Sequence, residues 1–181
     1  MKVIETKLKG CFVIEPKVFK DNRGSFFESY NKQKFENAID REIDFVQDNQ
    51  SISKKGTLRG LHFQMGEYAQ SKLVRVLSGE VLDVVVDLRA KSETFGQHFK
   101  LKLSTENKKM LFIPKGMAHG FLTLSEEAIF AYKCDEYYHQ ASENGILYND
   151  ESLQIDWEYP MESVILSQKD RELSKFKELF P

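Results

Sequence analysis

The residues best suited to acid–base chemistry lie in one stretch, 57–76, which otherwise has the composition of β-strands. It carries Arg59, His62 and Lys72 between apolar neighbours. Histidine is the strongest candidate, because its unperturbed pKa of about 6.5 lets it take up and release a proton near neutral pH. Basic side chains inside strands indicate a polar site within a sheet structure. A core histidine bonded to a backbone carbonyl and a strand-end lysine reaching solvent would give the same pattern.

Strand geometry restricts how these side chains can meet. His62 shares its expected strand face with Leu58, Gly60 and Gln64, since alternate residues of a strand point to the same side. Arg59 has the opposite parity. Arg59 and His62 can therefore enter one cavity only if the strand bulges at Gly60 or ends there.

Further polar groups occur on other predicted strands. Tyr132 shares a face with Phe130 and Cys134, so its phenol is either a proton donor aimed into a cavity or a strand tyrosine with a satisfied hydroxyl. Gln47 and Asn49 also share a face. Such neutral polar residues suit hydrogen bonding to a base or a sugar, and they equally suit a solvated surface.

His119 lies in PKGMAHGF, residues 114–121, a Pro-Gly turn that leads into a strand. This segment resembles the second motif of the cupin superfamily, whose first motif normally carries H-x-H and a glutamate that bind a metal. Here Phe63 and Gln64 follow His62, and the chain has four histidines in all. Two histidine ligands make a poor transition-metal site, so we expect no metal.

The elements that must position these residues are mostly short strands bounded by turns, which predicts an all-β sandwich or barrel. A helix is expected at 31–39 behind an Asn cap, and an amphipathic helix at 169–180 with Leu173, Phe176, Leu179 and Phe180 on one side. Within 81–88 one face is wholly apolar and the other carries two aspartates, which suits a core side and a cavity side. Strands are expected at 11–19, 25–30, 45–52, 57–64, 72–77, 81–88, 98–103, 110–113, 118–124 and 129–136.

Composition restricts the class of partner. With 181 residues the chain is expected to form one domain, 1–181, and its formal net charge of −2 provides no overall field that would attract nucleic acid or an anionic membrane. An anionic ligand must therefore be held by a local cluster of basic groups. The N-terminus has no apolar signal region and no apolar run approaches about 20 residues, so no membrane segment is expected. Cys11 and Cys134 are expected to be reduced, buried thiols in a cytoplasmic protein.

Eight ordered motifs resemble one family, dTDP-4-dehydrorhamnose 3,5-epimerase, over nearly the whole chain. That resemblance implies an all-β, cupin-like jelly-roll barrel with a few short helices, no cofactor, and a homodimer with exchanged N-terminal strands. It implies conversion of dTDP-4-dehydro-6-deoxy-D-glucose to dTDP-4-dehydro-L-rhamnose by epimerisation at C3 and C5. The motifs are DNRGSFFESY (21–30), FVQDNQS (45–51), TLRGLHFQ (57–64), QSKLVRVLSGEVLDVVVDLR (70–89), FIPKGMAHGFLTL (112–124), YKCDEYY (132–138), YNDESLQIDW (148–157) and LSQKD (166–170).

The same resemblance implies a role for each candidate residue. His62 matches the catalytic base, Asp170 the acid that orients it, and Tyr132 the proton donor. Lys72 matches a group that lines the sugar site and could stabilise charge on the C4 oxygen. The remaining matches are substrate-binding positions: Arg23, Glu28, Gln47, Asp48, Asn49, Arg59, His119, Glu143 and Lys169.

Small departures, such as Phe63 where tyrosine is common, leave the exact substrate open. The alternatives are an epimerase acting at one carbon, a ketoisomerase on a related nucleotide sugar, a metal-dependent cupin, and a non-catalytic sugar-nucleotide-binding barrel. Binding alone needs neither an acid nor a base, so the combination of His62, Lys72, Tyr132 and Asp170 favours an enzyme.

Overall fold

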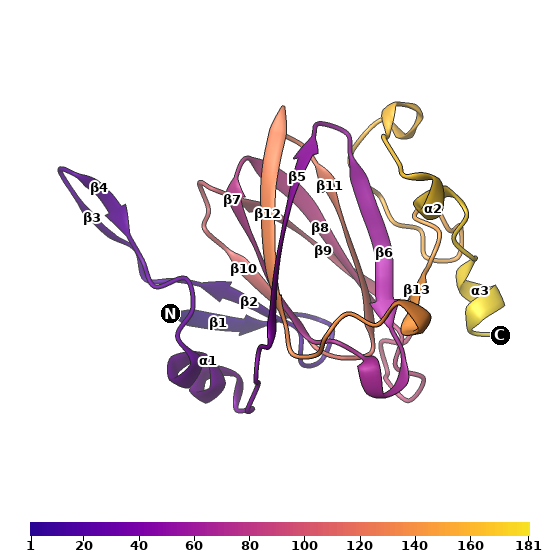
Figure 1. Cartoon of the computed structure of the whole chain (residues 1–181), viewed down its shortest axis with the longest axis horizontal. Coiled ribbons are helices and arrows are strands. Elements are labelled where there is room, and N and C mark those ends of the chain that lie inside the picture. Colours follow the sequence, from indigo (N-terminus) through magenta and orange to yellow (C-terminus); the bar gives the residue numbers. More distant parts are fainter.

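Two antiparallel sheets face each other in the computed structural model, which describes residues 1–181 (Figure 1). All neighbouring strands within them run antiparallel. The six-stranded sheet has the order β1 (Lys2–Glu5), β2 (Phe12–Glu15), β10 (Met110–Ile113), β7 (Lys72–Ser78), β12 (Glu127–Cys134) and β5 (Gln47–Lys54). The five-stranded sheet has the order β13 (Glu143–Gly145), β6 (Leu58–Gln64), β11 (Met117–Thr123), β8 (Glu80–Asp87) and β9 (His98–Ser104). This arrangement confirms the predicted all-β, cupin-like jelly roll.

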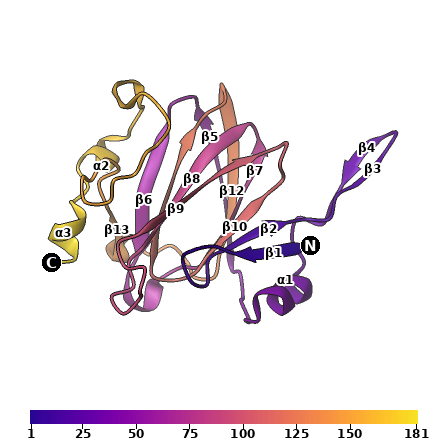
Figure 2. The same cartoon turned by 180° about the vertical axis from the view of Figure 1, so that it is seen from behind.

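Short elements lie outside the two sheets. A hairpin of β3 (Phe19–Asp21) and β4 (Gly24–Phe26) projects from the body on the same side as α1 (Lys32–Ile39), as Figures 1 and 2 show. The C-terminal α2 (Gln168–Arg171) and α3 (Phe176–Leu179) lie on the opposite side, beyond β6. The remaining elements are three 3-10 helices: η1 (Gly66–Tyr68), η2 (Gln140–Ser142) and η3 (Met161–Ser163).

Three apolar clusters hold these layers together. The first fills the space between the sheets and includes Val74 and Phe130 from one sheet and Val85 and Phe121 from the other. The second covers the outer face of the five-stranded sheet, where the C-terminal segment packs. In the third, α1 covers the outer face of the six-stranded sheet with Phe35 and Ile39. Asn31 caps α1 by accepting a hydrogen bond from the Lys34 amide at 3.1 Å, as predicted.

Strand β8 has the two predicted faces. Its apolar face, which includes Leu82, Val84 and Val86, packs against the C-terminal segment in the second cluster. Its mixed face points between the sheets and places Asp83 and Asp87 in the interior with no exposed surface. Both aspartates have bonding partners there, as buried carboxylates require.

Strand β6 has a bulge at Gly60. This confirms the prediction that the strand must bulge or end there if Arg59 and His62 are to enter the same cavity. His119 of β11 pairs with His62, but Phe121, two residues on, pairs with Arg59, so β6 holds one extra residue. Gly60 has φ of 137°, and a Cβ there would lie 2.5 Å from the Cα of Gly120. The bulge also corrects one prediction: Leu58 packs in the outer cluster, so it does not share a face with His62.

Several boundaries differ from the prediction. The expected helix 169–180 is two short helices, because Ser174 forms a parallel β-bridge with Ile146 and the chain is extended there. The expected strand 25–30 is limited to β4, and β1 and β13 were not predicted. Cys11 and Cys134 are buried and unpaired, as expected. No helix has the length and apolar character needed to cross a membrane.

Candidate functional site

A cavity of about 330 Å³ lies between the two sheets. Its size is at the lower end of the range for small-molecule sites. Most of its lining is polar, and eight of the predicted site residues line it together: Asn49, Arg59, His62, Lys72, His119, Tyr132, Lys169 and Asp170. The other lining residues are Gln50, Ser51, Phe121, Phe130 and Ser167. Residues from strands of both sheets and from the C-terminal segment therefore converge on one site.

His62 and Asp170 form an imidazole–carboxylate pair. The Nε2 atom of His62 on β6 lies 2.5 Å from Oδ1 of Asp170 on α2. Asp170 is 4% exposed, whereas the His62 side chain keeps 28% of its surface exposed on the cavity side. With Nε2–H donating to the carboxylate, the lone pair of a neutral imidazole is on Nδ1. The pair thus has the geometry of a base whose tautomer is set by an acid behind it.

The Asp170 carboxylate has a second partner, the Ser167 hydroxyl. Ser167 Oγ donates to Asp170 Oδ2 at 2.9 Å. Burial alone would raise the pKa of Asp170, but the hydrogen bond and charge of His62, the Ser167 hydroxyl and the nearby Lys169 outweigh it and hold the pKa below its usual value. Asp170 is therefore an anion at neutral pH.

Tyr132 and Lys72 reach the cavity from the opposite sheet. Tyr132 is on β12 and Lys72 begins β7, and Lys72 Nζ lies 5.7 Å from the centre of the Tyr132 ring. Burial raises the pKa of Tyr132, although the charge of Arg59 partly opposes that effect, so the phenol stays protonated at neutral pH. Burial lowers the pKa of Lys72, against the opposing influence of neighbouring acidic groups that include Glu143. The sheet wall with the Tyr132 phenol and the Lys72 side chain thus faces the wall with the His62 imidazole.

His119 has its own carboxylate partner, which sequence reasoning did not assign. Its Nε2 lies 2.8 Å from Oδ2 of Asp83, and Asp83 is fully buried. Oδ1 of Asp83 has no hydrogen-bond partner. The available signal was that Asp83 is one of two aspartates on the mixed face of 81–88, which was expected to be the cavity side. Because His119 pairs directly with His62 across β11 and β6, two histidine–carboxylate pairs lie side by side on one wall.

The position of Arg59 is fixed by strand β5. Its Nε donates to Ser53 Oγ at 3.0 Å, and the side chain lines the cavity. On the same strand Asn49 accepts a hydrogen bond from the Gln47 side-chain amide at 3.0 Å. Gln47 accepts in turn from the backbone N–H of Tyr138, also at 3.0 Å. Gln47 thus stands behind Asn49 and does not itself line the cavity.

Glu143 and Lys169 meet near the cavity. Lys169 Nζ lies 2.5 Å from Glu143 Oε2, which also accepts a hydrogen bond from the Tyr138 hydroxyl at 2.7 Å. Burial would raise the pKa of Glu143, but Lys169 and Tyr138 outweigh burial and lower it. Glu143 is outside the cavity lining and acts on it through Lys169.

Three predicted binding residues lie away from this cavity. Arg23 is at the tip of the β3–β4 hairpin, where it bonds Asp21. Asp48 has the opposite parity to Asn49 on β5 and pairs with Lys133 at 2.9 Å. The sequence positions of these residues matched the family pattern, but within one chain they do not join the site.

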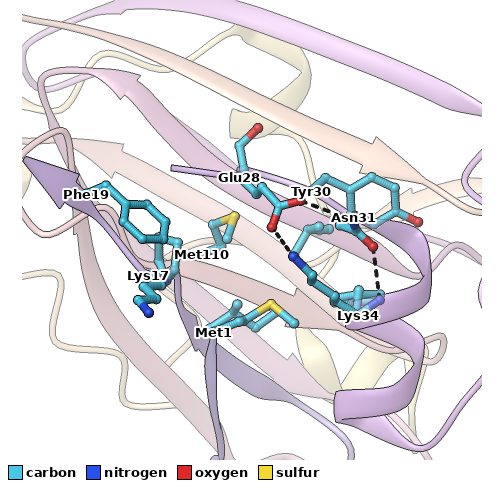
Figure 3. A pocket seen from close by; sticks show the side chains of 13 residues that line it. Met1, Lys17, Phe19, Glu28, Tyr30, Asn31, Lys34 and Met110 are labelled. Carbon is cyan, nitrogen blue, oxygen red and sulfur yellow. Dashed lines mark hydrogen bonds and ion pairs between the residues drawn. The ribbon is translucent and has the colours of Figure 1, made fainter. Parts of the chain in front are cut away.

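Glu28 belongs to a second, more apolar pocket of about 310 Å³, shown in Figure 3. There Glu28 accepts a hydrogen bond from Asn31 at 3.1 Å and pairs with Lys34. The floor includes Leu73 and Met110, which belong to the cluster on the outer face of the six-stranded sheet. This pocket is therefore separated from the first cavity by the sheet itself.

The structure holds no group of three or more histidine, cysteine, aspartate or glutamate side chains placed to bind one metal ion. Both cavity histidines instead contact a single carboxylate each.

Comparison with known proteins identifies the family. The family model described as dTDP-4-dehydrorhamnose 3,5-epimerase matches residues 5–178. The chain belongs to this epimerase family. The Salmonella typhimurium dTDP-4-dehydrorhamnose 3,5-epimerase is 58% identical over 159 residues, which cover 88% of this chain and 87% of that protein.

Solved structures agree with this assignment to the epimerase family. The crystal structure of the Elizabethkingia anophelis dTDP-4-dehydrorhamnose 3,5-epimerase superposes with a TM-score of 0.95 at 52% identity, covering 98% of this chain and 97% of the other. The Legionella pneumophila dTDP-6-deoxy-D-glucose-3,5-epimerase, solved in complex with dTDP-4-keto-L-rhamnose, gives a TM-score of 0.93 at 49% identity. That match covers 97% of this chain and 93% of the other.

Proposed function

We propose that this protein epimerises dTDP-4-dehydro-6-deoxy-D-glucose at C3 and C5 to give dTDP-4-dehydro-L-rhamnose. Membership of the epimerase family supports this assignment of the substrate. The observation that carries the proposal is the placement of the His62–Asp170 pair and the Tyr132 phenol on facing walls of one cavity. Inversion at carbon needs a base on one face of the ring and an acid on the other, and this cavity has both.

The first half-reaction removes a proton from carbon. C3 and C5 flank the C4 carbonyl, so loss of either proton gives an enolate. His62 Nδ1 accepts the proton, and the imidazolium that forms is stabilised by the Asp170 carboxylate 2.5 Å from Nε2. The low pKa of Asp170 keeps the carboxylate charged throughout.

The second half-reaction returns a proton to the opposite face. Tyr132 is suited to this step, because its raised pKa keeps it protonated until the basic enolate carbon demands the proton. Lys72 lies on the same wall and stabilises negative charge that develops on the C4 oxygen. The reaction involves no net oxidation or reduction. Each inversion leaves His62 protonated and Tyr132 ionised, and proton exchange with solvent restores both groups before the second carbon reacts.

Binding of the nucleotide sugar is assigned to the remaining cavity residues. Arg59 and Lys169 provide positive charge for the diphosphate, for which the guanidinium fork of arginine is well shaped. Asn49, fixed by Gln47, and His119, fixed by Asp83, provide hydrogen bonds for the sugar. Glu143 holds Lys169 in place.

We also propose that the protein acts as a homodimer in which N-terminal segments are exchanged. In the single chain β2 pairs with its own β10, so the exchange concerns the projecting β3–β4 hairpin. Two phenyl rings on this hairpin are largely exposed: Phe19 is 53% exposed and Phe26 is 67% exposed. In a dimer the hairpin would carry Arg23, and Glu28 just after it, to the cavity of the second copy.

A mixing experiment tests this arrangement. The inactive variants Arg23→Ala and His62→Ala are combined and allowed to exchange subunits. One of the two sites in a mixed dimer then has an intact His62 and receives an intact Arg23 from its partner, so activity returns. Failure of the mixture to recover activity, or a monomeric mass in light scattering, would reject the exchanged dimer.

The reaction itself is tested by NMR of dTDP-4-dehydro-6-deoxy-D-glucose with the protein in deuterium oxide. Deuterium is expected at both C3 and C5, together with the L-rhamno product. Deuterium at one carbon only would indicate a single-carbon epimerase, and a 3-keto product would indicate a ketoisomerase. His62→Asn is the matched negative control.

We further propose a cytoplasmic location, which the two unpaired thiols of Cys11 and Cys134 support, because disulfides are rare in that compartment. Cell fractionation with an antibody against the protein tests it. Recovery in the periplasmic or extracellular fraction would reject the assignment.

A further inference from the structure

The hydroxyl of Ser167 has only one way to distribute its hydrogen bonds. Ser167 is the N-cap of α2, and its Oγ accepts from the backbone N–H of Asp170 at 3.1 Å. The hydroxyl has a single proton, and Oδ2 of Asp170 lies 2.9 Å away. Because Asp170 is ionised and cannot donate, the hydroxyl must donate to it.

The Asp170 carboxylate therefore does not make the helix-capping hydrogen bond that its position in α2 would allow. An acidic residue at the third position of a helix commonly reaches back to the N-cap backbone N–H in a capping box. Here Oδ1 is directed to His62 at 2.5 Å and Oδ2 to the Ser167 hydroxyl. Each oxygen of this nearly buried carboxylate has one side-chain partner, so its rotation is fixed from both ends.

We propose that Ser167 is a positioning residue of the proton-transfer site, the third member of a Ser167–Asp170–His62 chain. This inference rests on the proposed function. Ser167 does two things: its oxygen closes the first turn of α2, and its proton fixes the carboxylate against the imidazole. The second action orients His62 Nδ1 toward the sugar carbon. It should therefore affect turnover and leave substrate affinity unchanged.

Three substitutions separate the two actions. Ser167→Thr keeps both the helix cap and the donor. Ser167→Ala removes both. Ser167→Asp keeps the cap, because aspartate is as good an N-cap as serine, but it replaces the neutral hydroxyl donor by a carboxylate that competes with Asp170 for a proton and so weakens the charge of Asp170.

The expected kinetics follow from that separation. Loss of the hydrogen-bond partner behind a metal-binding histidine or carboxylate typically lowers affinity or activity about 10- to 100-fold, and Ser167 stands in the same relation to the Asp170–His62 pair. We expect kcat to fall by about this factor in Ser167→Ala and Ser167→Asp, with KM within about twofold of wild type, and to be nearly unchanged in Ser167→Thr. Wild-type turnover in Ser167→Asp would show that only the helix cap matters and would overturn the proposal. A rise in KM without loss of kcat would overturn it as well.

A readout that does not depend on turnover separates this inference from the proposed function. The proton between His62 Nε2 and Asp170 gives its own NMR resonance in the free protein. We expect that resonance to persist in Ser167→Thr and to shift or disappear in Ser167→Ala and Ser167→Asp, whether or not the wild type converts the keto sugar. An identical resonance in all four proteins would refute the positioning role. Circular dichroism checks that each variant is folded.

Discussion

Replacement of Asp170 by asparagine removes the negative charge beside the proposed base, His62, and changes the hydrogen bonds that orient it. The amide keeps the shape of the carboxylate but has one acceptor oxygen in place of two. If that oxygen accepts from Ser167, the NH2 group faces His62 Nε2 and disfavours the tautomer in which Nδ1 is free. The imidazolium formed during proton removal would also lose its counter-charge. At an effective dielectric constant of about 20, two unit charges about 4 Å apart attract by about 4 kcal/mol, which corresponds to about 10³-fold in rate. Because His62 is 28% exposed at the cavity, solvent recovers part of this energy, and we expect a loss of about 10²–10³ in kcat.

The assay is the rate of deuterium incorporation at C3 and C5 of the keto sugar, followed by NMR under saturating substrate. KM should change little, because the lost interaction forms only as the imidazole becomes charged. Glu172→Gln is the matched control: it makes the same chemical change at an exposed residue at the end of α2. A kcat of Asp170→Asn within about fivefold of wild type would refute the claim that Asp170 stabilises the protonated base.

Three further predictions concern the donor, the bulge and an interior carboxylate. Tyr132→Phe should lower product formation by about 10²-fold while proton removal is less affected, since only the return of the proton needs the phenol; an equal loss in both NMR rates would contradict this role. Gly60→Ala should lower the free energy of unfolding by about 2 kcal/mol or more in urea, because φ is 137° and the new Cβ would lie 2.5 Å from Gly120 Cα; unchanged stability would disprove the required close approach. Burial would raise the pKa of Asp87, but hydrogen bonds from Arg89 and two hydroxyls lower it well below its usual value. The ionised Asp87 carboxylate therefore makes its full contribution to the free energy of unfolding above its unfolded-state pKa of about 4. That contribution is lost as the pH falls below this value. Asp87→Asn should then cost about 2–4 kcal/mol at pH 7, with a gap to wild type that narrows below about pH 4 in denaturation curves; a gap independent of pH would contradict the charge-based account.

The alternation of residue types was sufficient to predict most of the sheet. β8 was correctly divided into an apolar and a mixed face, because each side of this strand meets a different apolar cluster. The parity conflict between Arg59 and His62 correctly indicated a bulge or strand end, although the pattern alone could not choose between them. The bulge was decided by the close approach of Gly60 to Gly120, which is a tertiary contact.

The features that the sequence pattern did not predict depend on contacts between segments that are far apart in the chain. The apolar spacing of 169–180 predicts one helix, but a β-bridge between Ser174 and Ile146 divides it. Asp170 is 108 residues from His62, and only the family resemblance connected them before the structure did. Asp83 was visible as an aspartate on an inward face, yet its partner His119 lies on another strand.

The origin of Asp170 in the last segment of the chain has a consequence for biosynthesis. Translation is vectorial, so β6 with His62 and every other strand of both sheets are synthesised before α2. The strands that carry His62 and its neighbours therefore exist while the proposed carboxylate partner of the imidazole has yet to be synthesised. The proposed base is completed only when the C-terminal segment docks, and a chain truncated after β13 would lack both Asp170 and much of the apolar cover of the five-stranded sheet.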